Sequence, residues 1–252
     1  MQPNLEVLFT PAEFDALKNR DLSNTVCVVF DVLRATTSIL TALQHGATQV
    51  FPVKEISEAL ALRRGRAQTA LLAGERDGLR IRAAQTGEGD FDLGNSPREF
   101  TPERVAGRGI IMTTTNGTRA LQACLGASRI LVGALLNLGA LARWINGQPP
   151  PNLILVGAGT FENAAYEDAL AAGALSELVW DHFDRPADSA QIALEIYRAG
   201  RRNLLAAVQE HSANARRLLA QPDLRDDVPF AMQRDIIHFA AELKNGVVVK
   251  MD

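Results

Sequence analysis

The segment IIMTTTNGTRAL, residues 110–121, joins an apolar run to a helix-like run through three threonines, an asparagine and a glycine. A continuously apolar run indicates a strand covered on both faces, and the helical pattern behind it indicates a helix packed on the sheet. Strand, polar turn and helix in that order form the repeating unit of an α/β protein. The segment therefore indicates both the fold class and a place to look for a site.

Similar units recur along the chain. Strands are expected at VCVVF (26–30), VFPV (50–53), ALLAG (70–74), GIIMT (109–113), RILVG (129–133), LILVG (153–157) and VVVK (247–250). Helices are expected at TTSILTALQHG (36–46), EISEALALRRGRA (55–67), TRALQACLGA (118–127), NLGALARWING (137–147) and NAAYEDALAAGALSELVWDHF (163–183). The alternation predicts an α/β fold with a mostly parallel, mixed sheet layered between helices.

Two regions depart from this alternation. Residues 76–108 are rich in Gly, Asp, Arg and Pro, so we expect one long loop around FDLGNSP (91–97). From about residue 188 the chain turns mostly helical, at QIALEIYRAG (191–200), LLAAVQEHSANARRLLA (204–220) and FAMQRDIIHFAAELKNG (230–246). We expect one domain over residues 1–252, with two closely packed lobes as the alternative.

Composition restricts the partner and the location. Apolar residues make up 47% of the 252 residues, and 26 basic against 29 acidic residues give a formal charge of −3. This balance disfavours nucleic acid and anionic membranes as partners. The chain lacks an apolar run of membrane-spanning length, and its N-terminal MQPNLEVLFTPAEFDALK lacks the basic and then apolar regions of a leader. We expect a cytoplasmic protein with a small-molecule partner.

Ligands of α/β proteins bind where the carboxyl ends of strands meet loops and helix starts. In VVFDVLRATTSIL (28–40), Asp31 follows a strand, with Arg34, Thr36 and Thr37 behind it. Asp31 can bind a divalent metal or act as base or nucleophile, while Arg34 can grip an oxyanion. An Asp turn with a threonine cap is the structural alternative.

The opening segment offers a second strand end. Gly117 permits close approach, and the amides of residues 118–120 can point at an anion. Threonine hydroxyls and the Asn116 amide complete a polar cradle, with Arg119 nearby. An ordinary capped turn between strand and helix is the alternative.

Two further strand ends carry acids. ALLAGERDG (70–78) places Glu75, Arg76 and Asp77 after an apolar run. LILVGAGTFENAAYEDAL (153–170) contains GAG, a weak nucleotide signal because Glu162 replaces the third glycine of GxGxxG. Glu167 and Asp168 are adjacent on a helix, so we expect only one to face the site and favour Asp168, with a solvated acidic face as the alternative. Together these acids and arginines indicate an Mg²⁺-assisted site for an anionic, phosphorylated ligand.

Five motifs resemble the 2-phosphosulfolactate phosphatase family, in the family's order: DVLRATT (31–37), GER (74–76), FDLGNSP (91–97), TTTNGTRAL (113–121) and YEDALAAGAL (166–175). The resemblance implies an Mg²⁺-dependent acid phosphatase that hydrolyses 2-phosphosulfolactate to sulfolactate and phosphate, on the route to coenzyme M. It also implies a family-specific α/β fold and a homodimer. One departure is that Ala171 and Ala172 stand where a cysteine is expected, which indicates a helix-packing position.

Motif by motif, the resemblance carries over a set of site residues, whose roles are our hypothesis. The catalytic candidates are Asp31, Arg34, Glu75, Arg76 and Asn116. The candidates for phosphate binding are Thr36, Thr37, Asn95, Ser96, Thr114, Thr115, Gly117 and Thr118. The candidate Mg²⁺ ligands are Asp31, Glu75, Glu167 and Asp168. For a distal anion of the substrate, the candidates are Arg80, Arg82 and Arg98, with solvated charges as the alternative.

Other phosphatase mechanisms do not fit the residues. Cys27 and Cys124 lie in apolar patterns and have no arginine six positions on, so we expect core thiols. A haloacid dehalogenase-type enzyme places a second aspartate two residues after the first, where this chain has Leu33. Attack by a metal-positioned water remains. The rival functions are a binding module for a phosphorylated metabolite, a phosphatase for another small phosphorylated acid, and a nucleotide-binding oxidoreductase.

Overall fold

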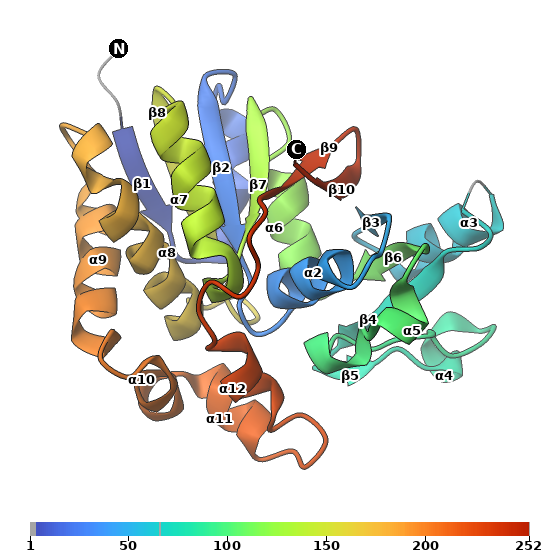
Figure 1. The fold of residues 1–252 in the computed structure, drawn as a ribbon. Coiled ribbons are helices and arrows are strands. Elements are labelled where there is room, and N and C mark those ends of the chain that lie inside the picture. The colour runs from blue at the N-terminus through green and yellow to red at the C-terminus, as the bar shows by residue number, and fades with distance from the viewer. Residues whose placement is uncertain (1–3, 66, 252) are drawn as a thin grey trace.

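A computed structural model describes residues 4–65 and 67–251 and has ten strands in one mixed sheet (Figure 1). The sheet order is β1-β8-β2-β7-β9-β10-β3-β6-β4-β5. The strands are β1 (Asn4–Leu8), β2 (Thr25–Phe30), β3 (Gln49–Pro52), β4 (Leu71–Arg76), β5 (Leu79–Arg80), β6 (Gly109–Thr113), β7 (Arg129–Gly133), β8 (Asn152–Gly157), β9 (Ala241–Lys244) and β10 (Val247–Lys250). The predicted α/β class with a mixed, mostly parallel sheet is confirmed.

Helices surround this sheet (Figure 1). In the first half of the chain they are α1 (Pro11–Asp15), α2 (Ala35–Gln44), α3 (Ile56–Arg64), α4 (Ala83–Thr86), α5 (Pro102–Val105) and α6 (Gly117–Ala123). In the second half they are α7 (Leu138–Gly147), α8 (Tyr166–Val179), α9 (Asp188–Gly200), α10 (Leu204–His211), α11 (Ala213–Leu219) and α12 (Asp227–Ala231).

Two groups of parallel strands make up most of the sheet. β1, β8, β2 and β7 run parallel in one group, and β3, β6 and β4 run parallel in the other. The β9–β10 hairpin lies between the groups, with β9 antiparallel to β7 and β10 antiparallel to β3. The C-terminal end of the chain therefore joins the two groups. The prediction of one domain, with two lobes as the alternative, stays a prediction.

Both faces of the central strands are covered, as continuously apolar runs predict. On β2, Cys27 and Val29 pack into a cluster that includes Ile39 of α2, while Val28 and Phe30 pack on the opposite side into a cluster with α7 and α8. All these side chains are fully buried. Both cysteines are free and buried, which confirms that they are core thiols.

The prediction of a helix over 230–246 is wrong. α12 ends at Ala231, and residues 241–244 form β9, which pairs with β10. Asn245 and Gly246 connect these strands with φ angles of 53° and 81°. Positive φ at both turn residues is the requirement of a two-residue type I′ hairpin, which Asn-Gly satisfies. The turn chemistry outweighs the helical spacing of the preceding apolar residues.

Three other segments differ from the predictions. Residues 76–108 contain β5, α4, α5 and the short 3₁₀ helix η2 (Pro97–Glu99) rather than one structureless loop. β1 was not predicted, and it pairs with β8 at the edge of the sheet. The helix expected over 204–220 is broken at Ser212, whose hydroxyl caps α11 by accepting a hydrogen bond from the amide of Ala215.

Three predictions include residues that the structure does not describe. Outside the described residues lie the first three of the N-terminal stretch, Arg66 of the helix expected over 55–67, and residue 252 of the expected domain. In the part that is described, none of the helices combines the length and apolar character that a membrane crossing requires.

Candidate active site

A cleft lies where the carboxyl ends of strands from both parallel groups meet. Its free space is about 410 Å³, including the open mouth. The loops after β2, β4, β6 and β8 line it, and α11 contributes from the C-terminal part of the chain. The lining residues are Asp31, Leu33, Arg34, Glu75, Asp77, Gly78, Asn95, Thr115, Asn116, Gly159, Thr160, Phe161, Asn214 and Arg217.

Asp31 follows directly on β2 and is only 7% exposed. Its Oδ1 accepts a hydrogen bond from the amide of Ala35 at 3.0 Å, which fixes the carboxylate at the start of α2. The pKa of Asp31 is raised to about 7, mainly by burial and also by the charges of Glu75 and Glu167, against the lowering effects of the Ala35 amide and of Arg34. At neutral pH this carboxyl group can therefore take up or release a proton.

The turn after β6 is shaped around Asp31. A Cβ atom on Gly117 would lie 2.5 Å from Oδ2 of Asp31 and 2.6 Å from Cβ of Ala35, so the glycine provides the close approach that was predicted. Thr114 and Thr118 bond each other across the turn, the amide of Thr118 reaching Oγ1 of Thr114 at 3.2 Å. Of the three amides expected to cradle an anion, those of Thr118 and Ala120 instead donate within this turn, to Oγ1 of Thr114 and to the carbonyl of Asn116.

Glu75, 7% exposed, ties the end of β4 to that same turn. Its Oε1 accepts from the amide of Thr115 at 2.8 Å, and its Oε2 accepts from the amide of Gly78 at 2.7 Å. The two amide donors fix the position of the Glu75 carboxyl group in the cleft that Asp31 also lines.

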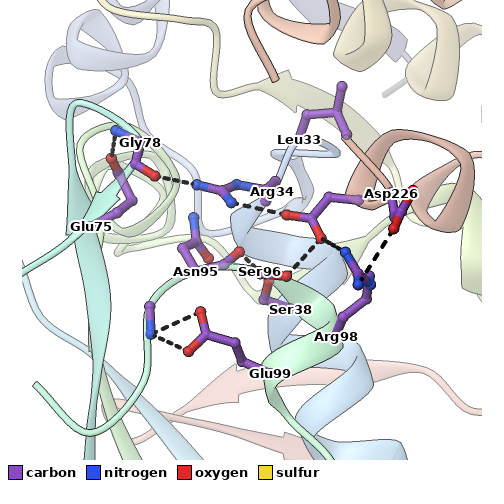
Figure 2. A network of polar contacts seen from close by, with 12 residues as sticks. Leu33, Arg34, Ser38, Glu75, Gly78, Asn95, Ser96, Arg98, Glu99 and Asp226 are labelled. Carbon is purple, nitrogen blue, oxygen red and sulfur yellow. Dashed lines mark hydrogen bonds and ion pairs between the residues drawn. The ribbon is translucent and has the colours of Figure 1, made fainter. Parts of the chain in front are cut away.

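Arg34 lines the cleft three residues after Asp31 and is 4% exposed. Figure 2 shows its guanidinium beside Gly78, whose carbonyl accepts a hydrogen bond from Nη2 at 2.7 Å, with Asn95 and Ser96 close by. Its Nη1 forms a 2.9 Å ion pair with the fully buried Asp227 at the start of α12. Ser96 donates to the other oxygen of Asp227 at 2.6 Å. Ser96 of the FDLGNSP motif and Asp227 of α12 therefore jointly fix the position of Arg34.

Burial raises the pKa of Asp227, against the lowering effects of the hydrogen bonds from Ser96 and Arg34. The ion pair compensates for removing both charges from water only while both partners are present.

Two side-chain amides complete the predicted part of the lining. Asn116 donates to the carbonyls of Ala158 at 2.9 Å and Phe161 at 2.7 Å, which ties the β6 turn to the loop after β8. Asn95 is 5% exposed, and within the described chain its buried Oδ1 has no hydrogen-bond partner. A buried amide oxygen without a donor is costly, so this atom is a candidate contact for a bound ligand or cation.

The chain resembles known proteins over most of its length. The family model of 2-phosphosulpholactate phosphatase matches residues 12–246. The chain belongs to this family. Family membership makes the chain a phosphoric monoester hydrolase and confirms the resemblance seen in the five motifs.

Three relatives carry the name probable 2-phosphosulfolactate phosphatase. The protein of Caldanaerobacter subterraneus subsp. tengcongensis is 38% identical over 242 residues, 96% of this chain and 97% of the relative. That of Thermotoga petrophila is 37% identical over 222 residues, 88% and 90% of the two chains. That of Clostridium novyi is 31% identical over 234 residues, 93% and 95%.

Glu167 and Asp168, from the last family motif, lie behind the cleft rather than in its lining. Asp168, which we favoured as the one facing the site, accepts from the amides of Val32 at 2.8 Å and Gly159 at 3.0 Å. Burial raises its pKa well above the ordinary range, and the charges of Glu167 and Asp31 add to the rise. Glu167 accepts from Ser212 at 2.7 Å. Both residues are buried, so the solvated acidic face is excluded.

Several other family positions support the loops without lining the cleft. Thr36 and Thr37 are fully buried and bond back to the carbonyls of Asp31 and Val32. Ala171 and Ala172 are fully buried within α8, in agreement with a helix-packing position.

Arg76 points away from the cleft into a neighbouring pocket lined also by Thr114, Thr115, Lys54 and Arg119. It bonds Oγ1 of Thr113 at 3.0 Å.

The three arginines expected to reach the distal end of a substrate are engaged elsewhere. Arg80 donates to the carbonyl of Asp92, Arg82 pairs with Asp90, and Arg98 pairs with Asp226 (Figure 2). The GAG turn differs from a nucleotide-binding loop, because α8 begins only at Tyr166 and an added Cβ on Gly159 would collide with the carbonyl of Asn163. Because the chain belongs to a phosphatase family, the alternative hypothesis of a nucleotide-binding oxidoreductase is rejected.

Sequence reasoning missed four contributors to the site: Phe161, Asn214, Arg217 and Asp227. The last three lie in the C-terminal helices, where ANARRLL and RDDVPF have the pattern of solvated helical faces. Only the polar Asn214 in the apolar register of its helix gives a local signal, since that position is 5% exposed.

Proposed function

We propose that this protein hydrolyses 2-phosphosulfolactate to sulfolactate and phosphate with Mg²⁺ as cofactor. The observation that carries the proposal is that the buried carboxyl groups of Asp31 and Glu75, at two strand ends, line one cleft together with the buried Arg34. The names of the full-length relatives supply the substrate.

The donor set fits Mg²⁺. In the described chain, no cluster of three or more His, Cys, Asp or Glu side chains is arranged for a metal, so amide and ligand oxygens would complete the coordination. Asp31, Glu75 and the unpartnered Oδ1 of Asn95 supply hard oxygen donors at the cleft. A divalent cation would also offset the repulsion that raises the pKa of Asp31. When bound, Mg²⁺ would neutralise charge on the phosphoryl oxygens and acidify a water molecule.

The remaining lining residues would bind and orient the phosphate ester. The guanidinium of Arg34, which Asp227 holds in the buried lining, would stabilise the phosphoryl oxygens as charge develops on them. Asp31 would hold a proton at its carboxyl group without the cation and release it on cation binding, as its raised pKa allows. Glu167 and Asp168 would hold the surrounding loops through the hydrogen bonds described above.

The proposal also covers the partner, the cellular location and the oligomeric state of the enzyme. The relatives' names and the formal charge of −3 support a small phosphorylated acid rather than nucleic acid as the partner. We also propose a cytoplasmic homodimer, which rests on the family resemblance and on the composition.

The test is phosphate release from racemic 2-phosphosulfolactate and from an aryl phosphate, each measured with Mg²⁺ and with EDTA. Mg²⁺-dependent turnover that prefers the sulfolactate ester is expected. Turnover of the aryl ester alone would keep the chemistry and reject the substrate. Tight phosphate binding without any turnover would instead favour a binding module.

A further inference from the structure

Arg217 of α11 reaches into the cleft and is the second arginine of its lining. Its Nη2 donates to Oδ1 of Asn214 at 2.8 Å, while its buried Nε has no hydrogen-bond partner within the described chain. The two terminal nitrogens lie 3.5 Å from where a Cβ of Gly78 would stand, so the side chain bridges from α11 to the turn after β4. The guanidinium also lies over the ring of Phe161, with its carbon 5.6 Å from the centroid.

The two arginines of the cleft differ in charge compensation. Arg34 forms an ion pair with Asp227. For Arg217, no carboxylate within the described ranges 4–65 and 67–251 lies at ion-pairing distance. The positive charge of Arg217 is therefore available to an anion that enters the cleft.

Arg217 is held in place by a chain of buried hydrogen bonds. Asn214 donates to the carbonyl of Leu33 at 2.7 Å and to Oε1 of Glu167 at 3.0 Å. Glu167 in turn accepts from Ser212, the cap of α11. Asn214 links Arg217 to the loop that carries Arg34, and so fixes the separation of the two guanidinium groups.

We propose that Arg217 binds the second anionic group of the substrate, its sulfonate or carboxylate, while the phosphate lies at Asp31 and Arg34. This inference rests on the proposed function, because it assigns a residue to the non-reacting end of that substrate. The planar guanidinium presents paired donors that match the oxygens of either anion. The ring of Phe161, which is 49% exposed, stacks against the guanidinium group of Arg217.

The experiment compares Arg217→Gln with wild type on three esters: 2-phosphosulfolactate, phospholactate, which lacks the sulfonate, and phenyl phosphate, which lacks both distal anions. For 2-phosphosulfolactate, kcat/KM is expected to fall about 10- to 100-fold, mainly through KM, as for loss of a charged hydrogen bond. Phenyl phosphate turnover should stay within about threefold, since the phosphate contacts remain. An equal fall on phospholactate assigns the carboxylate to Arg217, and a fall confined to 2-phosphosulfolactate assigns the sulfonate.

Two further variants separate binding from folding. Arg216→Gln, on the same helix but exposed and bonded to the carbonyl of Glu210, is the matched control and should match wild type. Arg217→Lys keeps the charge without the paired donors, so its loss should be intermediate. Equal losses on all three esters, or an unchanged KM for 2-phosphosulfolactate in Arg217→Gln, would overturn the assignment.

The wild-type data test the proposed function separately. If the wild type releases no phosphate from any of the esters, the proposed function fails. Calorimetric binding of sulfolactate and of phospholactate then tests Arg217 alone: weaker binding to Arg217→Gln than to Arg216→Gln supports the assignment, and equal binding overturns it.

Discussion

The two walls of the cleft are built in different ways. On one wall, the carboxyl groups of Asp31 and Glu75 accept hydrogen bonds from backbone amides. The donors of three such bonds lie 3, 4 and 40 residues away in the sequence. On the other wall, Asp227 and Asn214 reach Arg34 and Leu33 across 193 and 181 residues. In the proposed function, the first wall supplies the carboxyl groups, and the second holds Arg34 and supplies Arg217. The second wall therefore depends on contacts with the C-terminal part of the chain, whereas the first depends on contacts within 40 residues.

The largest expected effect is on the first wall. Asp31→Asn keeps an oxygen to accept the Ala35 amide but removes the carboxylate, so the fold should persist. Turnover of 2-phosphosulfolactate should fall about 100- to 1,000-fold or more, by analogy with the roughly 2.7 to 4 kcal/mol lost with one transition-state contact. Steady-state phosphate release with Mg²⁺ measures this, and near-normal turnover would remove Asp31 from the mechanism.

A smaller effect is expected on the second wall. Asp227→Asn leaves Arg34 buried without its charge partner, so turnover per folded molecule should fall about 10- to 100-fold, as for other partners that orient functional groups. Its neighbour Asp226 is 62% exposed and pairs with Arg98 at 3.5 Å, so Asp226→Asn is the matched control. Activity normalised to the folded fraction from circular dichroism measures both; equal behaviour of the two variants would contradict the orienting role.

A third prediction concerns stability without the cation. The folded-state pKa of Asp31 is raised to about 7, so the folded protein binds this proton more tightly than the unfolded chain does. The free energy of unfolding should therefore fall as pH rises from about 4 to about 7, and stay level above that range, as far as Asp31 is concerned. Urea unfolding in EDTA at pH 5 and pH 8 should show a smaller fall for Asp31→Asn than for wild type. Identical falls would contradict the raised pKa.

The smallest effect is expected at Arg76, which the motif places next to Glu75 but which points out of the cleft. Arg76→Gln should change kcat/KM for 2-phosphosulfolactate by less than about threefold, because no lining contact is lost. Parallel kinetics on wild type would detect a larger change, and a loss comparable to that of Asp31→Asn would place the reaction in the neighbouring pocket.

Much of the fold can be predicted because its signals are local. Apolar runs such as 26–30 and 109–113 match β2 and β6 closely, since a parallel strand covered on both faces requires a continuous apolar run. The failure at 230–246 is also local in origin, because the Asn-Gly turn before β10 specifies a hairpin against helical spacing.

The residues of the candidate site also divide into those with a local signal in the sequence and those without one. Asp31, Glu75 and Asn116 stand next to strand ends, so their position in the sequence already indicates their place in the cleft. Arg217 and Asp227 occupy short helices whose pattern resembles any solvated face, and only long-range packing brings them to Arg34. Arg76 stands next to Glu75 at a strand end but lies outside the cleft, because successive side chains on a strand point to opposite faces.

The most direct test is a crystal structure of the protein with Mg²⁺, sulfolactate and phosphate. The proposal places phosphate and cation between Asp31, Glu75 and Asn95, with the sulfonate or carboxylate on Arg217. Product bound instead in the neighbouring pocket, against Lys54, Arg76 and Arg119, would contradict the assignment of this cleft as the active site.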